Sequence, residues 1–212
     1  MLIKIKIASV FVLLTTSLIS SASELKGQLT LADSVKVDVG VIYLKPESFS
    51  PKSLIIDQTQ RIFHEPVYVT QPGSKVTIKN SDRSRHNVFI NNLQTDFKLN
   101  TGILRRNESR EYQVDWPTEH IARVGCFIHS TMISYVISIP SNEYDALVFN
   151  NNNPKVPFKV APVDYPFSIE YAKKPEVIYL ALPYRNVDPI DYSKGVHKIT
   201  EEGREIGTIT FF

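Results

Sequence analysis

The stretch Gly125-Cys126-Phe127-Ile128-His129-Ser130-Thr131-Met132-Ile133 carries the strongest structural and chemical signal in the chain. It holds the only cysteine and the only methionine besides Met1, with a histidine between them in the pattern C-x2-H-x2-M. Composition alone would place a histidine and a methionine at these offsets from a cysteine in about 2 of 10,000 cases, so chance is a poor explanation. Because two residues between ligands span a single tight turn, a loop with this spacing can wrap around one metal ion.

A second candidate ligand lies upstream, where the loop Asn80-Ser81-Asp82-Arg83-Ser84-Arg85 leads to His86. His86 can supply a fourth ligand from a separate strand end. Two imidazoles, a thiolate and a thioether form a soft donor set, and a His2Cys site with a weak axial methionine is typical of one-electron copper chemistry. Zinc prefers four strong ligands in a tetrahedron. We therefore predict a mononuclear copper site formed by His86, Cys126, His129 and Met132.

The segments around these residues alternate between apolar and polar side chains with a period of two, which is typical of strands. Clear alternation covers residues 35–39, 111–116 and 133–139, and the last segment places four apolar side chains on one face. No window of ten or more residues has a convincing period of 3.6 with helix caps. We therefore expect an all-β fold.

The motifs together resemble the cupredoxins, the type-1 or blue copper proteins, and among these the exported methylamine-utilisation-type cupredoxin-like proteins. The resemblance covers roughly residues 54–140. It rests on Phe63 and Pro66, Gly73-Ser74, Asn80-x-Asp82-x3-His86-Asn87-Val88, Gly125-Cys126-x2-His129-x2-Met132 and Tyr135-Val136. It implies a cupredoxin-like Greek-key β-sandwich with one type-1 copper ion bound by the four residues at one end. It also implies that Asn87 ties the His86 loop to the Cys126 loop.

The N-terminus has the pattern of a cleaved signal peptide. Lys4 and Lys6 precede an uncharged, mostly apolar run over residues 7–19, which is shorter than the ~20 residues of a membrane-spanning helix. Small residues at 21–23 suit a signal peptidase, so we place cleavage after Ser23. The expected location of the mature chain is the periplasm, with no membrane anchor after cleavage.

We expect the mature chain to contain a cupredoxin-like domain over residues 24–140, with its core at 54–140, and a small β-rich extension over residues 141–212. The division follows a change in composition, because seven of the 13 prolines fall between Pro154 and Pro189. Short apolar runs in the extension indicate strands between long turns. The sequence leaves open whether strands within residues 25–44 pair with the extension or with the central domain.

Charge and cysteine content exclude several classes of protein. The chain has 24 basic and 22 acidic side chains, and two of the basic ones lie in the signal peptide. A balanced mature chain lacks the basic field of a nucleic-acid binder. One cysteine excludes a disulfide framework, an iron–sulfur cluster and a binuclear copper site with two cysteine ligands. His64, His120 and His197 have no partner at ligand spacing, so we expect surface or core roles for them.

These observations favour an electron carrier over an enzyme, because they indicate no substrate pocket and no acid–base pair. The expected partners are a protein electron donor and acceptor. Two alternatives remain open: a copper-binding chaperone, storage protein or sensor, and a β-sandwich interaction module with a vestigial metal site. Arg83 and Arg85 are candidates to steer an acidic partner toward the metal end. Phe127 and Ile128 either form an apolar docking patch there or pack inside.

Overall fold

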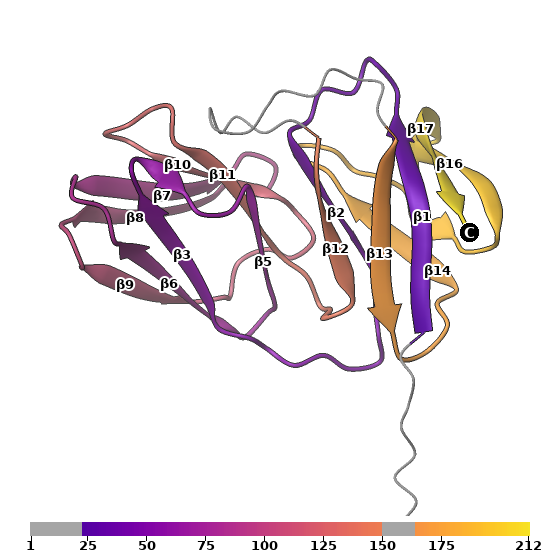
Figure 1. The fold of residues 1–212 in the computed structure, drawn as a ribbon, viewed down its shortest axis with the longest axis horizontal. Coiled ribbons are helices and arrows are strands. Elements are labelled where there is room, and N and C mark those ends of the chain that lie inside the picture. The colour runs from indigo at the N-terminus through magenta and orange to yellow at the C-terminus, as the bar shows by residue number, and fades with distance from the viewer. Residues whose placement is uncertain (1–22, 150–163) are drawn as a thin grey trace, which may run out of the picture.

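The computed structural model describes residues 23–149 and 164–212, and all of the regular secondary structure in these ranges is β (Figure 1). The predicted signal peptide, except for Ser23, lies outside the described residues. The strands form four sheets, arranged as two β-sandwiches. The prediction of an all-β sandwich fold is confirmed. None of the described residues forms a helix long and apolar enough to cross a bilayer.

The first sandwich comprises a five-stranded sheet in the order β5-β11-β10-β7-β8 and a four-stranded sheet in the order β4-β3-β6-β9. Its strands are β3 (Leu54–Thr59), β4 (Ile62–Phe63), β5 (Val67–Thr70), β6 (Lys75–Asn80), β7 (His86–Asn92), β8 (Phe97–Leu104), β9 (Ser109–Gln113), β10 (Ala122–Cys126) and β11 (Ile133–Ser138). The chain crosses repeatedly between the two sheets, as it does in Greek-key sandwiches. Two pairs are parallel, β3 with β6 and β5 with β11.

The second sandwich combines the N-terminal strands with the C-terminal extension. Its sheets have the orders β13-β1-β17-β16 and β12-β2-β14-β15. The strands are β1 (Ser23–Leu31), β2 (Val39–Tyr43), β12 (Tyr144–Val148), β13 (Tyr165–Tyr171), β14 (Val177–Ala181), β15 (Ile190–Asp191), β16 (Gly195–Glu201) and β17 (Arg204–Phe211). The sequence left open whether the strands within residues 25–44 pair with the central domain or with the extension. In the structure β1 and β2 pair with strands of the extension. This pairing differs from the expected division at residue 140, which grouped residues 24–44 with the central domain.

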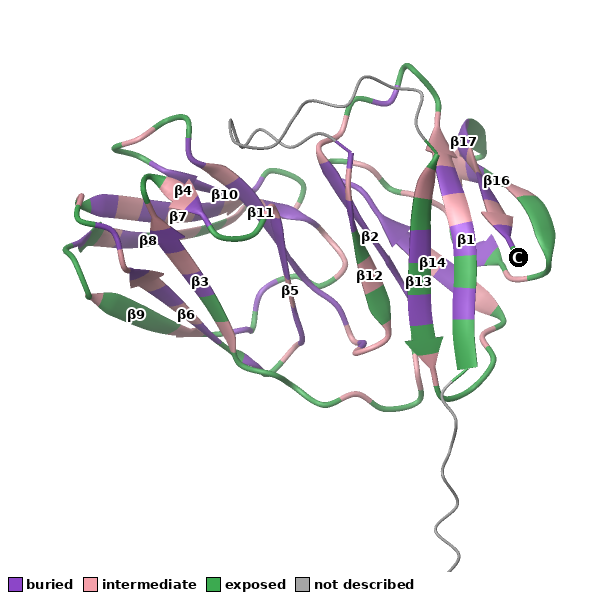
Figure 2. Cartoon of the chain, viewed as in Figure 1, coloured by how far each residue is buried: buried purple, intermediate pink, exposed green. Residues whose placement is uncertain are grey.

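The physical reason for this arrangement lies in β2, whose five residues are all buried (Figure 2). Ile42 belongs to the apolar core of the second sandwich, together with Leu25 and Leu29 from β1. Val41 and its neighbours on the opposite face pack against Ile137 of the first sandwich. A strand with two apolar faces must be covered on both sides, so β2 lies between two layers.

The apolar face predicted for residues 133–139 is also buried between the sandwiches. Tyr135, Ile137 and Ile139 form one cluster with strand β2, whereas Val136 points into the core of the first sandwich. The Tyr135 hydroxyl donates a hydrogen bond of 2.6 Å to Asp38, which precedes β2. The two sandwiches therefore share a continuous apolar layer with polar contacts at its margin.

Truncating Ile137 tests whether this layer stabilises the whole chain. Its side chain is fully buried, so Ile137→Ala is expected to lower the free energy of unfolding by about 2–5 kcal/mol. Ile55 on β3 is 58% exposed, so Ile55→Ala should change the free energy of unfolding by about 0.5 kcal/mol or less. Urea unfolding followed by tryptophan fluorescence measures both. Equal effects of the two substitutions would contradict a stabilising contact between the sandwiches.

Candidate metal centre

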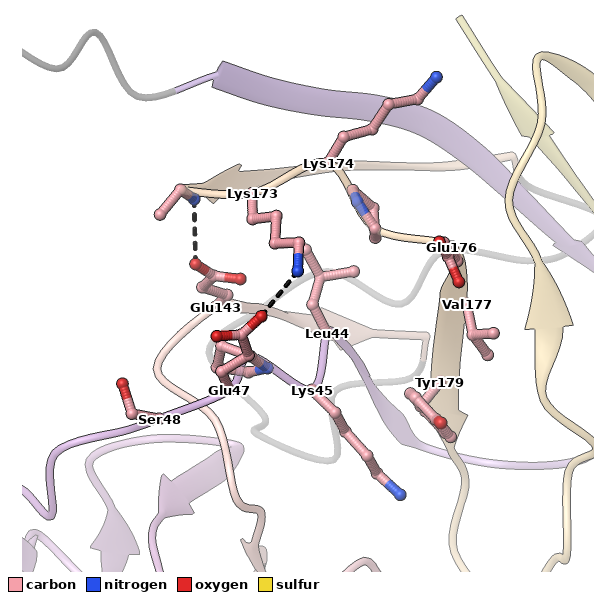
Figure 3. Close-up of a pocket in the computed structure, with 13 residues that line it drawn as sticks. Leu44, Lys45, Glu47, Ser48, Glu143, Lys173, Lys174, Glu176, Val177 and Tyr179 are labelled. Atoms are coloured by element: carbon pink, nitrogen blue, oxygen red, sulfur yellow. Dashed lines mark hydrogen bonds and ion pairs between the residues drawn. The ribbon is translucent and has the colours of Figure 1, made fainter.

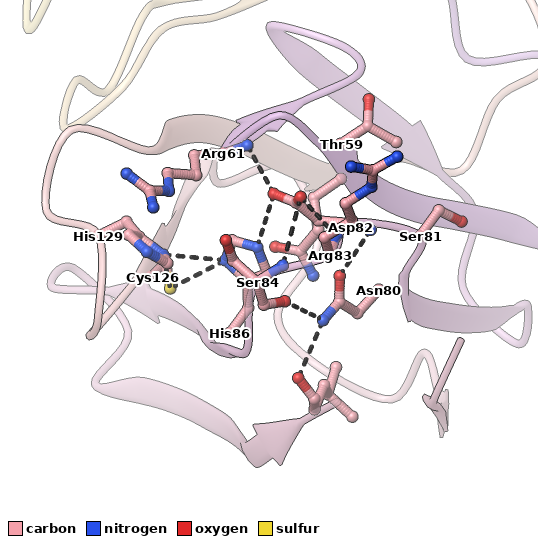
Figure 4. A network of polar contacts seen from close by, with 12 residues as sticks. Thr59, Arg61, Asn80, Ser81, Asp82, Arg83, Ser84, His86, Cys126 and His129 are labelled. Atoms are coloured by element: carbon pink, nitrogen blue, oxygen red, sulfur yellow. Dashed lines mark hydrogen bonds and ion pairs between the residues drawn. The ribbon is translucent and has the colours of Figure 1, made fainter. Parts of the chain in front are cut away.

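Three of the four predicted ligands meet at one end of the first sandwich (Figure 4). His86 opens β7 and Cys126 closes β10, and the antiparallel pairing of these strands places Cys126 opposite Val88. His129 follows in the loop before β11. The Nδ1 atom of His86 lies 3.6 Å from the Cys126 Sγ and 3.2 Å from the His129 Nδ1, and the Sγ lies 3.9 Å from the His129 Nδ1.

These three distances fit a single small metal ion. A circle through the three ligand atoms has a radius of about 2.1 Å, close to the metal–nitrogen and metal–sulfur bond lengths of ~2.0–2.3 Å that such ligands make. Two imidazole nitrogens and a cysteine sulfur converge there, and among the described residues no carboxylate joins this group. The donor chemistry and the spacing therefore both suit a three-ligand site for a soft transition metal.

Met132, the fourth predicted ligand, is buried in the core of the first sandwich. Its side chain is buried in the same apolar cluster as Cys126 and Val88. Its backbone N–H donates a hydrogen bond of 3.0 Å to the carbonyl of His129, which closes the turn between the two residues. The structure thus brings His86, Cys126 and His129 into mutual contact and buries Met132 in the apolar cluster that also contains Cys126.

The three ligands differ in their access to solvent. His86 and Cys126 are buried, whereas His129 is partly exposed at the end of the sandwich. Burial lowers the pKa of His129, and the nearby His86 and Arg61 act in the same direction. A lowered pKa favours the neutral imidazole, which is the form that binds metals.

A buried carboxylate supports His86 from behind. The Nε2 atom of His86 lies 3.1 Å from the Asp82 Oδ2, on the side of the ring away from Cys126. The same oxygen accepts a hydrogen bond of 2.7 Å from the backbone N–H of Arg61. Burial acts to raise the pKa of this carboxyl, but hydrogen bonds from Arg61, from His86 and from the loop backbone outweigh burial and lower the pKa to about 2. Asp82 is therefore a carboxylate at neutral pH.

Side chains at the end of β6 fix the loop that carries Asp82. The Asn80 Oδ1 accepts the backbone N–H of Asp82, and its Nδ2 donates to the carbonyls of Ser84 and Leu104 at 2.8 and 2.9 Å. Asp57 accepts hydrogen bonds from both the backbone N–H and the hydroxyl of Ser81. The loop between β6 and β7 thus has a defined conformation.

Sequence reasoning missed Arg61. Gln60 and Arg61 form the two-residue turn between β3 and β4, with φ angles of 53° and 59°. Such turns favour Asn or Gly because other residues are strained in this left-handed region, so the pair carries no sequence signal for the turn. The backbone N–H of Arg61 donates to Asp82, while the Arg61 side chain lies on the His129 side of the site (Figure 4).

The Cys126 loop is tied to β7 through the backbone of Asn87, not through its side chain, whose buried Oδ1 has no hydrogen-bond partner. The carbonyl of Asn87 accepts a hydrogen bond of 2.9 Å from the N–H of Phe127. Gly125 leaves room for the ring of Phe89, since an added Cβ would lie 2.4 Å from its Cζ. Phe89 in turn contacts the ring of Phe127, with centroids 4.5 Å apart.

Phe127 and Ile128 are on the surface. Their exposed fractions are 63% and 47%, which decides between the two predicted roles in favour of an apolar patch next to His129. The other histidines lie outside the ligand group, which is the one such cluster among the described residues. His64 hydrogen-bonds to Thr59, and His197 contacts the carbonyl of Ser193.

A cavity of about 510 Å³ lies away from this centre, beside strands β12 and β14 of the second sandwich (Figure 3). Two of the lysines that line it pair with acidic groups, and its other charged residues, Glu143, Lys174 and Glu176, are of mixed sign. Lys173 contacts Glu47 at 2.7 Å, and Lys45 contacts Glu119 at 2.6 Å. The cavity therefore presents no convergent set of uncompensated charges.

No protein-family model matches the chain, and no curated protein matches it either. Similar solved structures include a reduced mutant of amicyanin, which is 16% identical, has a TM-score of 0.36 and is matched over 46% of this chain and 97% of that chain. Reduced auracyanin from Roseiflexus castenholzii is 14% identical with a TM-score of 0.36, matched over 42% of this chain and 97% of its own. A purple cupredoxin from Nitrosopumilus maritimus is 16% identical with a TM-score of 0.34, matched over 41% and 99%. At these values, the chemistry of the site must be inferred from its own residues.

The left-handed conformation of Arg61 can be tested with two matched variants that both remove the guanidinium. Glycine adopts this conformation without the steric penalty that alanine meets. Arg61→Gly is therefore expected to unfold at a higher urea concentration than Arg61→Ala, by about 1 kcal/mol in the free energy of unfolding. Equal unfolding midpoints would show that the turn carries no strain at Arg61.

Proposed function

We propose that this chain is a periplasmic type-1 copper protein that carries single electrons between protein partners and is not itself an enzyme. The observation that supports the proposal is the triangle formed by the Nδ1 atoms of His86 and His129 and the Sγ of Cys126. Copper bound there would supply reversible one-electron chemistry. Met132 is the proposed weak fourth ligand, and its burial in the apolar cluster that contains Cys126 supports this role.

The frame of the site supports electron transfer over metal release. Strands β7 and β10 hold His86 and Cys126, and the tie between Asn87 and Phe127 fixes the following loop. Ligands held in this way keep nearly one geometry in both oxidation states, so little reorganisation accompanies a change in charge. His129 lies at the surface beside Phe127, which gives a short route from the site to a docked partner.

Export is part of the proposal because of the N-terminal pattern and the thiol. The pattern over residues 1–23 is that of a signal peptide. A lone thiol in an exported protein is open to oxidation and intermolecular pairing, and metal ligation removes this risk. Cys126 is buried and free in the structure, as a metal ligand in such a protein would be.

Addition of Cu(II) to the purified protein lacking residues 1–23 tests the site. We expect an intense visible band from thiolate-to-copper charge transfer, which Cys126→Ser abolishes because it removes the thiolate. His86→Ala should also weaken or shift the band, since it removes a second ligand. His64→Ala is the matched control and should leave the spectrum unchanged, because His64 lies outside the ligand group.

Voltammetry of the copper-loaded protein separates the proposed role from its alternatives. Reversible one-electron reduction supports an electron carrier. A colourless site that binds Cu(I) tightly and passes it to an acceptor would instead indicate a copper chaperone or storage protein. Absence of copper binding would contradict both and would leave an interaction module with a vestigial site.

We also propose that the metal end attracts an acidic partner. Arg61, Arg83 and Arg85 are exposed on the turn and loop that back His86. Among the described residues, no ion pair joins Arg83 or Arg85 to an acid, so their charge is available to a partner. Uncompensated charges near a redox site steer oppositely charged molecules toward it.

The rate at which hexacyanoferrate(III), an anionic oxidant, oxidises the reduced copper protein tests this steering. The rate constant is expected to fall as salt is added, because screening weakens the attraction. The double variant Arg83→Gln/Arg85→Gln should be slower at low ionic strength by about tenfold and less sensitive to salt. Arg204→Gln, which removes an exposed charge from the second sandwich, is the control. A rate independent of salt in the unmodified protein would rule out the steering.

A further inference from the structure

We propose that Asp82 is a positioning residue for the metal site. Its carboxylate fixes the His86 imidazole with the proton on Nε2, so that the Nδ1 lone pair faces Cys126 and His129. The negative charge behind His86 also favours the oxidised over the reduced state of the bound ion. This second effect rests on the proposed copper function, whereas the first concerns the protein alone.

The tautomer follows from the contacts on the two sides of the ring. Nε2 lies 3.1 Å from the Asp82 Oδ2, and Nδ1 lies 3.6 Å from the Cys126 Sγ. A neutral imidazole carries its proton on one nitrogen, and a carboxylate can only accept a hydrogen bond. The contact with Asp82 is therefore a bond from Nε2–H. Nδ1 is left as the atom with a free lone pair, which is the form that a metal requires.

The carboxylate can impose this choice because it is itself held. Its Oδ2 accepts a hydrogen bond of 2.7 Å from the Arg61 backbone N–H, and its Oδ1 accepts one of 2.6 Å from the N–H of Arg83. The backbone of Asp82 donates to the Asn80 side chain. Turning the carboxylate away from His86 would break its hydrogen bonds to the Arg61 turn and to the Arg83–Ser84 backbone, so the imidazole adjusts to Asp82.

The strained turn at Arg61 takes part in this arrangement. Arg61 has a positive φ, and its backbone N–H, which lies in the turn outside the β-ladder, donates to Asp82. Residues in such conformations persist where the surrounding structure holds them, and they cluster at functional sites. The strain is thus located at the residue that anchors the carboxylate supporting His86.

The effect on the bound ion follows from charge. A carboxylate hydrogen-bonded to a ligating imidazole raises the basicity of that ligand. A fixed negative charge also stabilises the more highly charged ion through Coulomb attraction. Removing the charge from Asp82 should therefore weaken the binding of Cu(II) more than that of Cu(I), which raises the reduction potential.

Asp82→Asn and Asp57→Asn form a matched pair for the test. Both remove a carboxylate that holds the same loop, but Asp57 bonds Ser81 and does not contact His86. In Asp82→Asn the amide keeps its oxygen toward the N–H groups of Arg83 and Ser84 and turns its NH2 toward His86, which then carries its proton on Nδ1. The same NH2 replaces the oxygen that accepts the Arg61 N–H, so this variant also loses that hydrogen bond. Asp82→Ser, which can still cap the loop but is too short to reach the imidazole, is measured alongside in case the first variant does not fold.

The first readout is the His86 tautomer in the metal-free protein, observed by 15N NMR of the imidazole. We expect Nε2–H in the unmodified protein and in Asp57→Asn, and loss of this preference in the Asp82 variants. The second is copper affinity in both oxidation states. Cu(II) affinity should fall by about 10–100-fold and Cu(I) affinity by less, and each tenfold difference raises the potential by about 59 mV.

The proposal is overturned if His86 keeps Nε2–H in both Asp82 variants, or if their potentials move no further than that of Asp57→Asn. Its failure is distinguishable from failure of the copper function. If the unmodified protein binds no copper, the proposed function fails, while the NMR measurement still decides whether Asp82 sets the tautomer.

Discussion

Because β7 and β10 pair antiparallel with Val88 opposite Cys126, His86 and Cys126 lie at the same end of one sheet although 40 positions separate them in the chain. Everything else at the centre is built on this pairing. The loop after Cys126 then needs only one tight turn to bring His129 to the other two ligand atoms. A shift of the register by one residue would move His86 to the opposite face of the sheet and away from Cys126.

Hydrogen bonds behind the candidate ligands offset the energetic cost of burying the polar side chains of His86 and Asp82. Buried polar groups destabilise a fold unless hydrogen bonds satisfy them. Here the backbone N–H groups of Arg61 and Arg83 satisfy the carboxylate, Asn80 accepts the backbone N–H of Asp82, and the carboxylate satisfies His86. The outer side of the centre is different in character, since Phe127 and Ile128 present apolar surface to solvent. The site therefore has a rigid, polar back and an accessible, apolar front.

The second sandwich belongs to the same folded body as the first, which carries the candidate metal centre. Strands β2 and β11 each supply residues to the layer between them, and the Tyr135–Asp38 hydrogen bond lies at its margin. The N-terminal strands complete the sheets of the C-terminal extension, so neither end of the chain could form this sandwich alone. The exposed Phe127 and Ile128 remain uncovered by it.

The sequence by itself determined the all-β class and the strand at residues 133–139, because alternation is a local property that a few residues express. The short spacing of the Cys126 loop likewise marked Cys126 and His129 as candidate ligands, and the predicted meeting of both with His86 is found in the structure. The tertiary structure decided which sheet β1 and β2 join, that the Ile137 face is buried between sandwiches, and that Phe127 is exposed. It also decided the roles of Arg61 and Asp82 around His86. These features depend on pairing between distant segments and on a turn without Gly or Asn, and neither leaves a pattern in neighbouring residues.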